Sequence, residues 1–456
     1  MTAVVLNPDR ELMTAARRLA GSMTERDRWS RARLEAFQRR RLAALVAHAA
    51  KHSPLYRERY AGIPLGCEPD LPRLPPLERS DLAERLDRVV TDRRLAALTS
   101  RTAPREPGGV LLGRYRLLTT GGTSGEAITV VYDRQAWLHA MAMPLRSDDF
   151  AGIDPAAPGC RRASIWASHP VHLSRRTESA HPAAKRLRLR ADEPWEDIIR
   201  ALNRFQPNIL SSYPSILRAL AAEQRQGRLA IAPATVWCAG EPLTAGARAS
   251  VHATWGSDLF DTYALTETAV IAVECPEHNG MHLLEDSVIV EVVDAGGAPV
   301  PDGEPGHHAL VTTLFNYVQP LIRYVVPDII TLSPHPCACG RPYRLITSIE
   351  GRSDEILEVG GATLSGAELR RAFGQLPGLC DFQVTATDRG VDVAAVAEGV
   401  PTVAFRAAVR ERLLAELERV GVQGWCEIDV RSVARLPRGD GGKLWSVAAS
   451  AVPGHD

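Results

Sequence analysis

Helical patterns alternate with short runs of β-branched residues along most of this chain, and this alternation limits the folds that it can adopt. Strand-like runs occur at 128–131, 236–238 and 288–293, separated by longer stretches of helical periodicity. Such a chain buries its strands in sheets that helices cover. The sequence therefore predicts an α/β fold with layered sheets, and its 456 residues suffice for two domains.

The clearest single helix is predicted over residues 30–52. Its apolar stripe is formed by Leu34, Phe37, Leu42, Leu45 and Val46. The arginines between them would face water, so we interpret this helix as packed on a domain core rather than as a partner-binding helix. The proline-rich stretch Leu71–Leu77 predicts a loop.

The last hundred residues have the pattern of a separate, small α+β unit. We place the boundary after residue 350, which gives a large domain over 1–350 and a small, mobile domain over 351–456. The expected elements of the small domain are a helix at Ser365–Phe373, a hairpin of Phe382–Ala386 and Val391–Val396 turned at Asp388–Gly390, a helix at Val403–Val420 and a strand at Glu427–Val433.

Composition excludes several classes of function. The formal net charge is zero, which gives no support for nucleic-acid binding. The N-terminus lacks the apolar core of a signal peptide, and no apolar run reaches membrane-spanning length. The eight cysteines of a long chain do not suggest a disulfide framework. A cytoplasmic enzyme is the expectation.

A loop rich in glycine and hydroxyl groups occupies Thr119–Gly125 (TTGGTSG). Three glycines allow the backbone to present several N–H groups, and four hydroxyls add donors, so the loop suits phosphate oxygens. It lacks the Gly-Lys-Thr/Ser ending of a Walker P-loop, which excludes an NTPase of that class. A surface turn without a ligand is the alternative.

The segment Asp261–Thr268 (DTYALTET) ends an apolar stretch. Its Glu267 carboxylate stands beside the Thr266 hydroxyl, and such a pair could hold a Mg²⁺ ion and a phosphate. The same pair is typical of a helix N-terminus, and the segment in isolation favours that second interpretation.

Asp328 follows the run that begins at Arg323, and Gly351–Asp354 (GRSD) comes shortly after it. The Asp328 carboxylate could accept hydrogen bonds from the paired hydroxyls of a ribose, as acidic residues do in other nucleotide sites. A surface carboxylate paired with an arginine is the alternative.

Lys443 ends the glycine-rich stretch Pro437–Lys443 (PRGDGGK). Only three of the 54 basic residues are lysines, so a lysine here is expected where a compact, rotatable ammonium is needed. On such a loop it could neutralise charge on a phosphate during its transfer. A solvated loop lysine is the alternative.

In this order and spacing, the four segments resemble the adenylate-forming superfamily of acyl-CoA synthetases and adenylation domains. The resemblance is closest to the phenylacetate–CoA ligase branch and covers almost the whole chain. Further stretches that resemble this branch are His52–Arg57 (HSPLYR), Ser211–Ser215 (SSYPS), Ala239–Pro242 (AGEP) and Leu314–Tyr324 (LFNYVQPLIRY).

The resemblance implies that ATP, with Mg²⁺, activates a small aryl or arylacetic acid to an acyl-adenylate, which then passes to a thiol. Coenzyme A is the first choice of acceptor, and a carrier protein or an amine remains open, as does a homodimeric assembly. One rival activity is transfer of AMP to a hydroxyl. Another is an idle adenylate-binding or zinc-stabilised interaction protein, against which Lys443, Glu267 and Asp328 together argue.

The resemblance also carries roles over by position. Residues that would wrap the ATP phosphates are Thr120, Gly121, Gly122, Thr123, Ser124 and Gly125. The adenine pocket would be lined by Gly240, Glu241, Pro242 and Tyr263. Asp261 would also belong to the nucleotide site, with Asp328 and Arg352 at the ribose. Thr266 would touch the α-phosphate and Glu267 would hold Mg²⁺. Lys443 would contact the carboxylate and the α-phosphate, Asp354 would be the hinge of the small domain, and Tyr213 and Ala264 would line the acid pocket.

Two departures from the branch stand out. Glu126 occupies the place where the phosphate loop often has a lysine, so positive charge there must come from Mg²⁺ or arginine. The segment before Asp328 also lacks the usual Thr-Gly. Neither change removes a group that the implied mechanism needs, but both bear on efficiency.

A metal site is the last candidate. Cys337 and Cys339 stand one residue apart, and a thiol and two imidazoles, Cys275, His278 and His282, come from a second segment. Three thiolates and one imidazole make a closed zinc set, and some members of the resembling branch show such a pairing. We expect a structural zinc on Cys275, His282, Cys337 and Cys339. His282 is favoured because it opens the strand-like run Leu283–Val293, and His278 is the other choice of imidazole.

Overall fold

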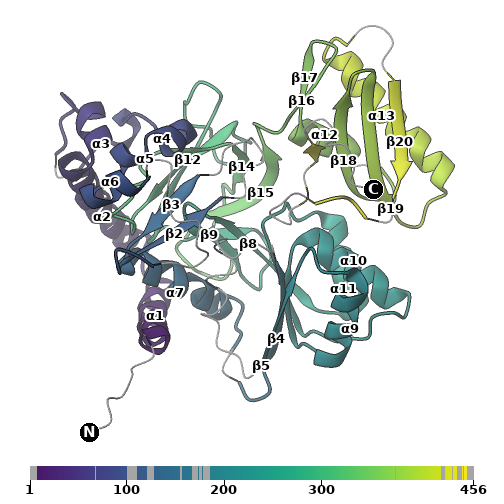
Figure 1. The fold of residues 1–456 in the computed structure, drawn as a ribbon, viewed down its shortest axis with the longest axis horizontal. Coiled ribbons are helices and arrows are strands. Elements are labelled where there is room, and N and C mark those ends of the chain that lie inside the picture. Colours follow the sequence, from purple (N-terminus) through teal and green to yellow (C-terminus); the bar gives the residue numbers. More distant parts are fainter. Residues whose placement is uncertain are drawn as a thin grey trace.

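The fold was analysed in a computed structural model (Figure 1). It describes residues 8–66, 68–99, 110–120, 128–154, 157–166, 173, 177, 185–374, 376–422, 427–433, 435–438, 444 and 446–448. The described part is a mixed α/β structure with several sheets, and the expected fold class is confirmed. Its helices include none that is both long and apolar enough to cross a membrane.

The N-terminal region is helical. Its elements are α1 (Pro8–Arg26), α2 (Arg31–His52), α3 (Pro54–Arg59), the 3₁₀ helix η1 (Leu71–Arg73), α4 (Arg79–Glu84), α5 (Leu86–Val89) and α6 (Arg93–Thr99). Ser30 caps α2, because its hydroxyl accepts a hydrogen bond from the backbone N–H of Arg33. The predicted helix at 30–52 is therefore confirmed, and four of its five stripe residues are buried, with Phe37 half-buried.

A nine-stranded sheet forms the centre of the N-terminal unit (Figure 1). One half is parallel and consists, in spatial order, of β8 (Asp258–Leu265), β7 (Thr235–Ala239), β6 (Ile209–Ser212), β4 (Arg161–Trp166) and β5 (Lys185–Arg190). The helices between these strands are α9 (Trp195–Phe205), α10 (Pro214–Arg225) and α11 (Ala245–Trp255). Side chains alternate between faces along a strand, so Val236 packs towards these helices while its neighbour Trp237 packs into the main core.

The other half of the sheet is antiparallel. It continues from β8 through β9 (Ala269–Glu274), β10 (Met281–Leu283), β15 (Leu345–Arg352) and β14 (Asp328–Leu332). Two three-stranded sheets accompany it, formed by β1 (Val110–Leu111), β2 (Tyr115–Thr119) and β3 (Thr129–Tyr132), and by β11 (Val288–Val293), β12 (His308–Thr313) and β13 (Tyr324–Val326). The helix α7 (Arg134–Phe150) follows β3 and packs into the main core.

The run Leu283–Val293 was expected to be one strand, and this expectation is wrong. Residues 284–287 form a turn, so β10 ends at Leu283 and β11 begins at Val288 in a different sheet. The reason lies in the buried polar residues of the turn. Asp286 and Ser287 need hydrogen-bond partners that a continuous strand would not bring to them.

The C-terminal unit has its own sheets and its own apolar core. It contains β16 (Ile356–Val359), β17 (Ala362–Ser365), α12 (Gly366–Phe373), β18 (Leu379–Thr387), β19 (Gly390–Ala397), α13 (Thr402–Arg419), β20 (Glu427–Ser432) and β21 (Val447–Ala448). The predicted helices, hairpin and strand of this region all occur within a few residues of their expected bounds. Since β15 extends to Arg352, the expected boundary after residue 350 falls inside a strand of the large sheet.

A fully buried arginine ties together segments that are far apart in sequence. Arg146 on α7 donates to Asp286 Oδ1 at 2.8 Å, to Asp27 Oδ1 at 3.1 Å and to the Tyr343 hydroxyl at 2.6 Å. Burial alone would raise the pKa of Asp286, but the Arg146 guanidinium holds it below its ordinary value. The cluster fixes α1, α7 and the β10–β11 turn relative to one another.

We expect Arg146→Met to lower the free energy of unfolding by about 3–5 kcal/mol, because it leaves the buried Asp27 carboxylate without its cation and leaves Asp286 with Arg26 alone. Urea denaturation measures this change. Arg134→Met, at the exposed start of the same helix, is the matched control and should change stability little. Equal effects of the two substitutions would show that the buried cluster contributes nothing specific.

Candidate functional site

The turn between β8 and β9 carries the first expected site residues. Thr266, Glu267 and Thr268 lie in this turn, so the interpretation of the segment as a helix N-terminus is wrong. The buried Glu267 accepts a hydrogen bond from the Tyr324 hydroxyl at 3.2 Å, and Arg79 Nη1 lies 3.8 Å from the same carboxylate oxygen. The turn thus presents a held carboxylate next to a threonine hydroxyl.

The backbone of this turn is also anchored. The Tyr132 hydroxyl, from β3, donates to the Thr266 carbonyl at 2.7 Å. Burial, together with the charge of Glu267, raises the pKa of Tyr132 far above its ordinary value, so this hydroxyl stays protonated and remains a donor. The position of Thr266 is therefore set by a strand that is distant in sequence.

Asp328 and Tyr263 form the second part of the site. The Tyr263 hydroxyl donates to Asp328 Oδ2 at 2.5 Å, and both side chains are buried. Burial and the neighbouring Asp328 carboxylate raise the pKa of Tyr263 well above its ordinary value. Since Tyr263 lies on β8 and Asp328 opens β14, this contact joins the centre of the sheet to its edge.

Arg352 lies opposite Asp328 because the two residues are paired across β14 and β15. Its Nη1 is 3.9 Å from Asp328 Oδ1, while its other guanidinium nitrogens donate to both oxygens of Asp354 at 2.8 and 2.7 Å. The charge of Glu267 contributes to raising the pKa of both Arg352 and Tyr263, so the two parts of the site are coupled electrostatically.

Gly240, Glu241 and Pro242 follow β7, and Gly240 has a φ of +84°, which favours glycine. The Glu241 carboxylate is bound by Ser215 of α10 and by Arg438 and Leu444 of the C-terminal unit. Among the described residues, this carboxylate thus joins the two units of the chain.

The expected wall residues of the acid pocket, Tyr213 and Ala264, are both placed at the ends of strands. Tyr213 is buried and packs edge-on against Trp166, with ring centroids 5.1 Å apart. Ala264 is half-buried and packs against the main core. Arg438 stands 5.9 Å from the Tyr213 ring.

Several expected residues lie outside the described part of the chain. They are Gly121, Gly122, Thr123, Ser124, Gly125, Glu126 and Lys443. Thr120, which precedes this group, is described: its N–H donates to the Ile128 carbonyl and its hydroxyl accepts from the Ile128 N–H, both at 3.0 Å. These two bonds join Thr120 and Ile128, the described residues on either side of the glycine-rich segment.

The structure brings Cys275, His282, Cys337 and Cys339 into one cluster, with all ligand atoms within 4.8 Å of one another. The Sγ atoms of Cys275 and Cys337 are 3.7 Å apart, and Cys339 Sγ is 3.3 Å from His282 Nε2. A tetrahedron with bonds of about 2.3 Å to sulfur has S–S edges of about 3.7–3.8 Å. The donor set and its spacing therefore fit a closed zinc site.

His278 lies elsewhere. Its Nδ1 is 3.4 Å from Glu274 Oε2 and 3.3 Å from Arg248 Nη1. Burial lowers the pKa of His282 to about 4, which keeps that imidazole neutral, the form that ligates metals. Of the two imidazoles that the sequence left open, the structure places His282 with the thiols.

Asp261 belongs to a polar cluster that the sequence did not indicate. Its backbone N–H donates to Glu274 Oε2 at 2.9 Å, and its carboxylate is 3.4 Å from Cys238 Sγ. Arg248 donates to Glu274 at 2.7 Å. Burial, and then the charge of Glu274, raises the pKa of Asp261 to about 7.

Sequence reasoning missed the residues that hold the site in place. Arg79, Tyr132 and Tyr324 all act on the Glu267 turn, although only Tyr324 stands in a stretch that we had singled out. No local pattern marks Arg79 or Tyr132, because their contacts depend on how α4 and β3 pack against elements that are distant in sequence.

Comparison with known proteins agrees with this geometry. A model of the AMP-binding enzyme family matches residues 180–309. The chain is 27% identical to a phenylacetate-coenzyme A ligase of Thermus thermophilus, over 91% of this chain and 96% of that protein. It is 29% identical to a phenylacetate-coenzyme A ligase of Pseudomonas putida, over 73% of each. These matches support placing the chain in the adenylate-forming superfamily, with the phenylacetate–CoA ligases as its most similar branch among these relatives.

Solved structures show the same fold. The chain superposes on 2-hydroxyisobutyryl-CoA ligase in the postadenylation state with a TM-score of 0.70 and 19% identity, over 90% of this chain and 88% of that one. The same ligase in its thioesterfication state gives a TM-score of 0.60, over 92% and 90%.

We expect Asp261→Asn to change how stability depends on pH. Because the folded pKa of about 7 exceeds the ordinary value of 3.8, the folded protein retains a proton that the unfolded chain releases between these values. The unfolding free energy of the wild type should thus fall as pH rises through this window. The unfolding free energy of the variant relative to the wild type should rise over the same window and level off above about pH 7.

Thermal and urea unfolding from pH 4 to 8 measure this difference. Asp261 keeps part of its surface accessible, so the slope should stay below the limit of about 1.4 kcal/mol per pH unit. Asp258→Asn, at the exposed start of the same strand, is the control. A pH-independent difference would show that Asp261 is ionised in the folded state throughout.

Proposed function

We propose that this chain uses ATP to activate a small carboxylic acid and then transfers the acyl group to the thiol of coenzyme A. The observation that carries the proposal is the grouping of Tyr263, Glu267 and Asp328 around one end of β8. Relatives named phenylacetate-coenzyme A ligase, matched over most of the chain, support the same activity.

The chemistry requires two negative species to meet. An oxygen of the acid attacks the α-phosphorus of ATP, the bond from that phosphorus to the bridging oxygen breaks, and pyrophosphate leaves in line. The coenzyme A sulfur then attacks the acyl carbon, its proton goes to solvent and AMP leaves. The protein must therefore supply positive charge and alignment in the first step, and admit a thiol in the second.

The described residues suit the nucleotide in this proposal. Asp328 would accept hydrogen bonds from the ribose hydroxyls, with Arg352 and Tyr263 keeping the carboxylate in place. Thr266 would contact the α-phosphate, and Thr120 with the glycine-rich segment after it would bind the remaining phosphates. Lys443 would contact the acid and the α-phosphate during adenylation.

Magnesium is the proposed ion at Glu267. A buried carboxylate already aligned by Tyr324 is a suitable oxygen ligand for a hard cation that bridges phosphates. The ion would lower the charge repulsion between ATP and the acid, which matters because the loop has Glu126 where relatives often have a lysine. Arg79, 3.8 Å from Glu267, is a second source of positive charge.

The acid and the acceptor are proposed from the branch. An aryl or arylacetic acid would pack against Tyr213 and Ala264, since an aromatic ring offers a stacking surface and a small side chain leaves room for a flat ring. Coenzyme A is proposed as the acceptor ahead of a carrier protein. ATP and coenzyme A are cytoplasmic compounds, so we expect the enzyme in the cytoplasm. A homodimer stays an open alternative for its assembly.

The small domain is proposed to turn about Asp354 between the two half-reactions. We keep residues 351–456 as this domain, carrying Lys443, and 1–350 as the part that binds ATP and the acid. Such a turn would withdraw Lys443 after adenylation and open a path for the thiol.

Zinc is the proposed metal of the Cys275, His282, Cys337 and Cys339 cluster. Four protein ligands leave no open coordination position, so the metal would be structural. It would join the β9–β10 connection to the segment before β15. The first of these regions follows the Glu267 turn in sequence, and the second follows Asp328. The metal would thereby stabilise the sheet on which the nucleotide site is built.

We expect acid-dependent exchange of pyrophosphate into ATP when the protein is offered a panel of aryl and arylacetic acids. Lys443→Ala should lower this exchange by roughly 10²–10³-fold, because it removes a preorganised donor to the transition state. The same variant should still form thioester from preformed acyl-adenylate and coenzyme A.

Lys185→Ala is the matched control, since Lys185 is an exposed lysine on β5. No exchange with any acid would contradict the proposed activity. An equal loss of both half-reactions in Lys443→Ala would instead assign Lys443 a structural role.

For the metal, we expect elemental analysis of protein purified without added metal to find one zinc per chain. Cys337→Ser should lose that zinc and lower the melting temperature, because zinc binds the folded chain and not the unfolded one. Cys380→Ser, at a half-buried cysteine outside the cluster, should keep both. Wild-type protein that is free of zinc and equally stable in the presence of a chelator would contradict the assignment.

A further inference from the structure

The Glu241 carboxylate is saturated by protein donors. Oε1 accepts from Arg438 Nη1 at 3.0 Å and from the Leu444 N–H at 2.7 Å. Oε2 accepts from the Ser215 N–H at 3.2 Å and from its hydroxyl at 2.5 Å. A carboxylate offers about four acceptor positions, and here four donors occupy them. With a side chain only 5% exposed, Glu241 has no oxygen directed at a ligand in this arrangement.

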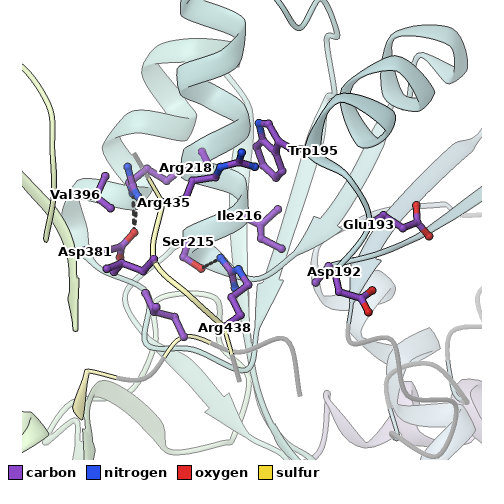
Figure 2. A pocket seen from close by; sticks show the side chains of 14 residues that line it. Asp192, Glu193, Trp195, Ser215, Ile216, Arg218, Asp381, Val396, Arg435 and Arg438 are labelled. Atoms are coloured by element: carbon purple, nitrogen blue, oxygen red, sulfur yellow. Dashed lines mark hydrogen bonds and ion pairs between the residues drawn. The ribbon is translucent and has the colours of Figure 1, made fainter. Parts of the chain in front are cut away.

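Two of these donors bracket the segment that carries Lys443. Arg438 precedes residues 439–443, and Leu444 is bonded directly to Lys443 in the chain. One carboxylate of the N-terminal unit therefore holds both ends of this stretch. Ser215 completes the arrangement, since its hydroxyl accepts from Arg438 Nη2 at 2.6 Å (Figure 2). The same hydroxyl donates to Glu241.

A second set of contacts docks the same two units through α10. Arg218, only 7% exposed, donates to Asp381 at 3.0 Å through Nε and lies 3.5 Å from Glu398. Arg225 reaches Glu398 at 2.7 Å. Ser215, Arg218 and Arg225 all belong to α10. Ser215, Arg218 and Asp381 line a pocket of about 380 Å³ at the junction (Figure 2). The helix is thus the docking surface for the C-terminal unit in this arrangement.

We propose that Glu241 is a positioning residue for adenylation, because it anchors Arg438 and Leu444, the described residues that stand on either side of residues 439–443 in the sequence. This inference rests on the proposed function and replaces the expected role of Glu241 in the adenine pocket. A carboxylate is required because all four partners donate. A glutamine would have no charge to attract Arg438, and its NH₂ group would face two of the donors, of which only the Ser215 hydroxyl can also accept.

Hydrogen exchange of the unliganded protein tests the contact without reference to activity. In Glu241→Gln the Leu444 amide should exchange about 10- to 100-fold faster, since hydrogen bonds to charged groups are worth about 1.5–3 kcal/mol and 1.36 kcal/mol is a factor of ten. The amides of Ser446 and Val447 are internal controls, because they donate to Glu355 within the C-terminal unit. Unchanged exchange at Leu444, or equal acceleration at all three amides, would overturn the proposal.

Kinetics of the separated half-reactions test the role. Glu241→Gln and Arg438→Ala should each lower kcat of ATP–pyrophosphate exchange by about 10- to 100-fold, with the KM for ATP nearly unchanged and thioester formation from preformed acyl-adenylate retained. Arg435→Ala is the matched control, because Arg435 stacks on Trp195 in the same pocket, 4.8 Å from the ring, and should leave both half-reactions intact.

A rise in the KM for ATP with kcat preserved in Glu241→Gln would return Glu241 to the adenine pocket and overturn the inference. So would full activity in Arg438→Ala. Wild-type protein without exchange on any acid would contradict the proposed function, whereas the protection of the Leu444 amide by Glu241 would still be decided by hydrogen exchange.

Discussion

The strand β8 is the constraint around which the site is arranged. It pairs in parallel with β7 and antiparallel with β9, so it is the line at which the large sheet changes direction. Ligands of α/β sheets bind beyond the carboxyl ends of such strands. Tyr263 lies near that end and Glu267 in the turn after it, while the antiparallel half returns Asp328 to the same place. A shift of one residue in β8 would turn Tyr263 away from Asp328.

The contacts between the two units of the chain are mostly polar. Glu241, Arg218 and Arg225 meet Arg438, Asp381 and Glu398, while the apolar core of the C-terminal unit stays within that unit. An interface of charged hydrogen bonds can be exchanged for contacts with water, whereas separating a large apolar surface cannot be compensated in this way. The junction is therefore specific in orientation, and its polar character is compatible with the proposed movement of the small domain.

Much of the fold could be predicted from the sequence, because the periodicity of local stretches reflects local burial. The helix at 30–52 and the C-terminal hairpin are examples. The break between β10 and β11 could not be predicted, since it depends on the distant Arg146, which needs Asp286 as a partner. In the site, glycine-rich and acidic motifs marked candidate residues, yet the partners of Glu267 and Glu241 come from strands and a helix that no local pattern connects. The cysteine spacing was informative because its donors are chemically distinctive.

Arg352 has a further consequence for the order of events in a catalytic cycle. Its guanidinium is shared between Asp328, on the sheet, and Asp354, two residues further along the chain. If Asp354 is the proposed hinge and Asp328 the proposed ribose ligand, a rotation of the backbone at Asp354 would change the position of the guanidinium beside Asp328. The Arg352–Asp354 pair is partly open to water, so this link would be weak. Arg352 would then couple the release of a nucleotide to the rotation of the small domain without preventing that rotation.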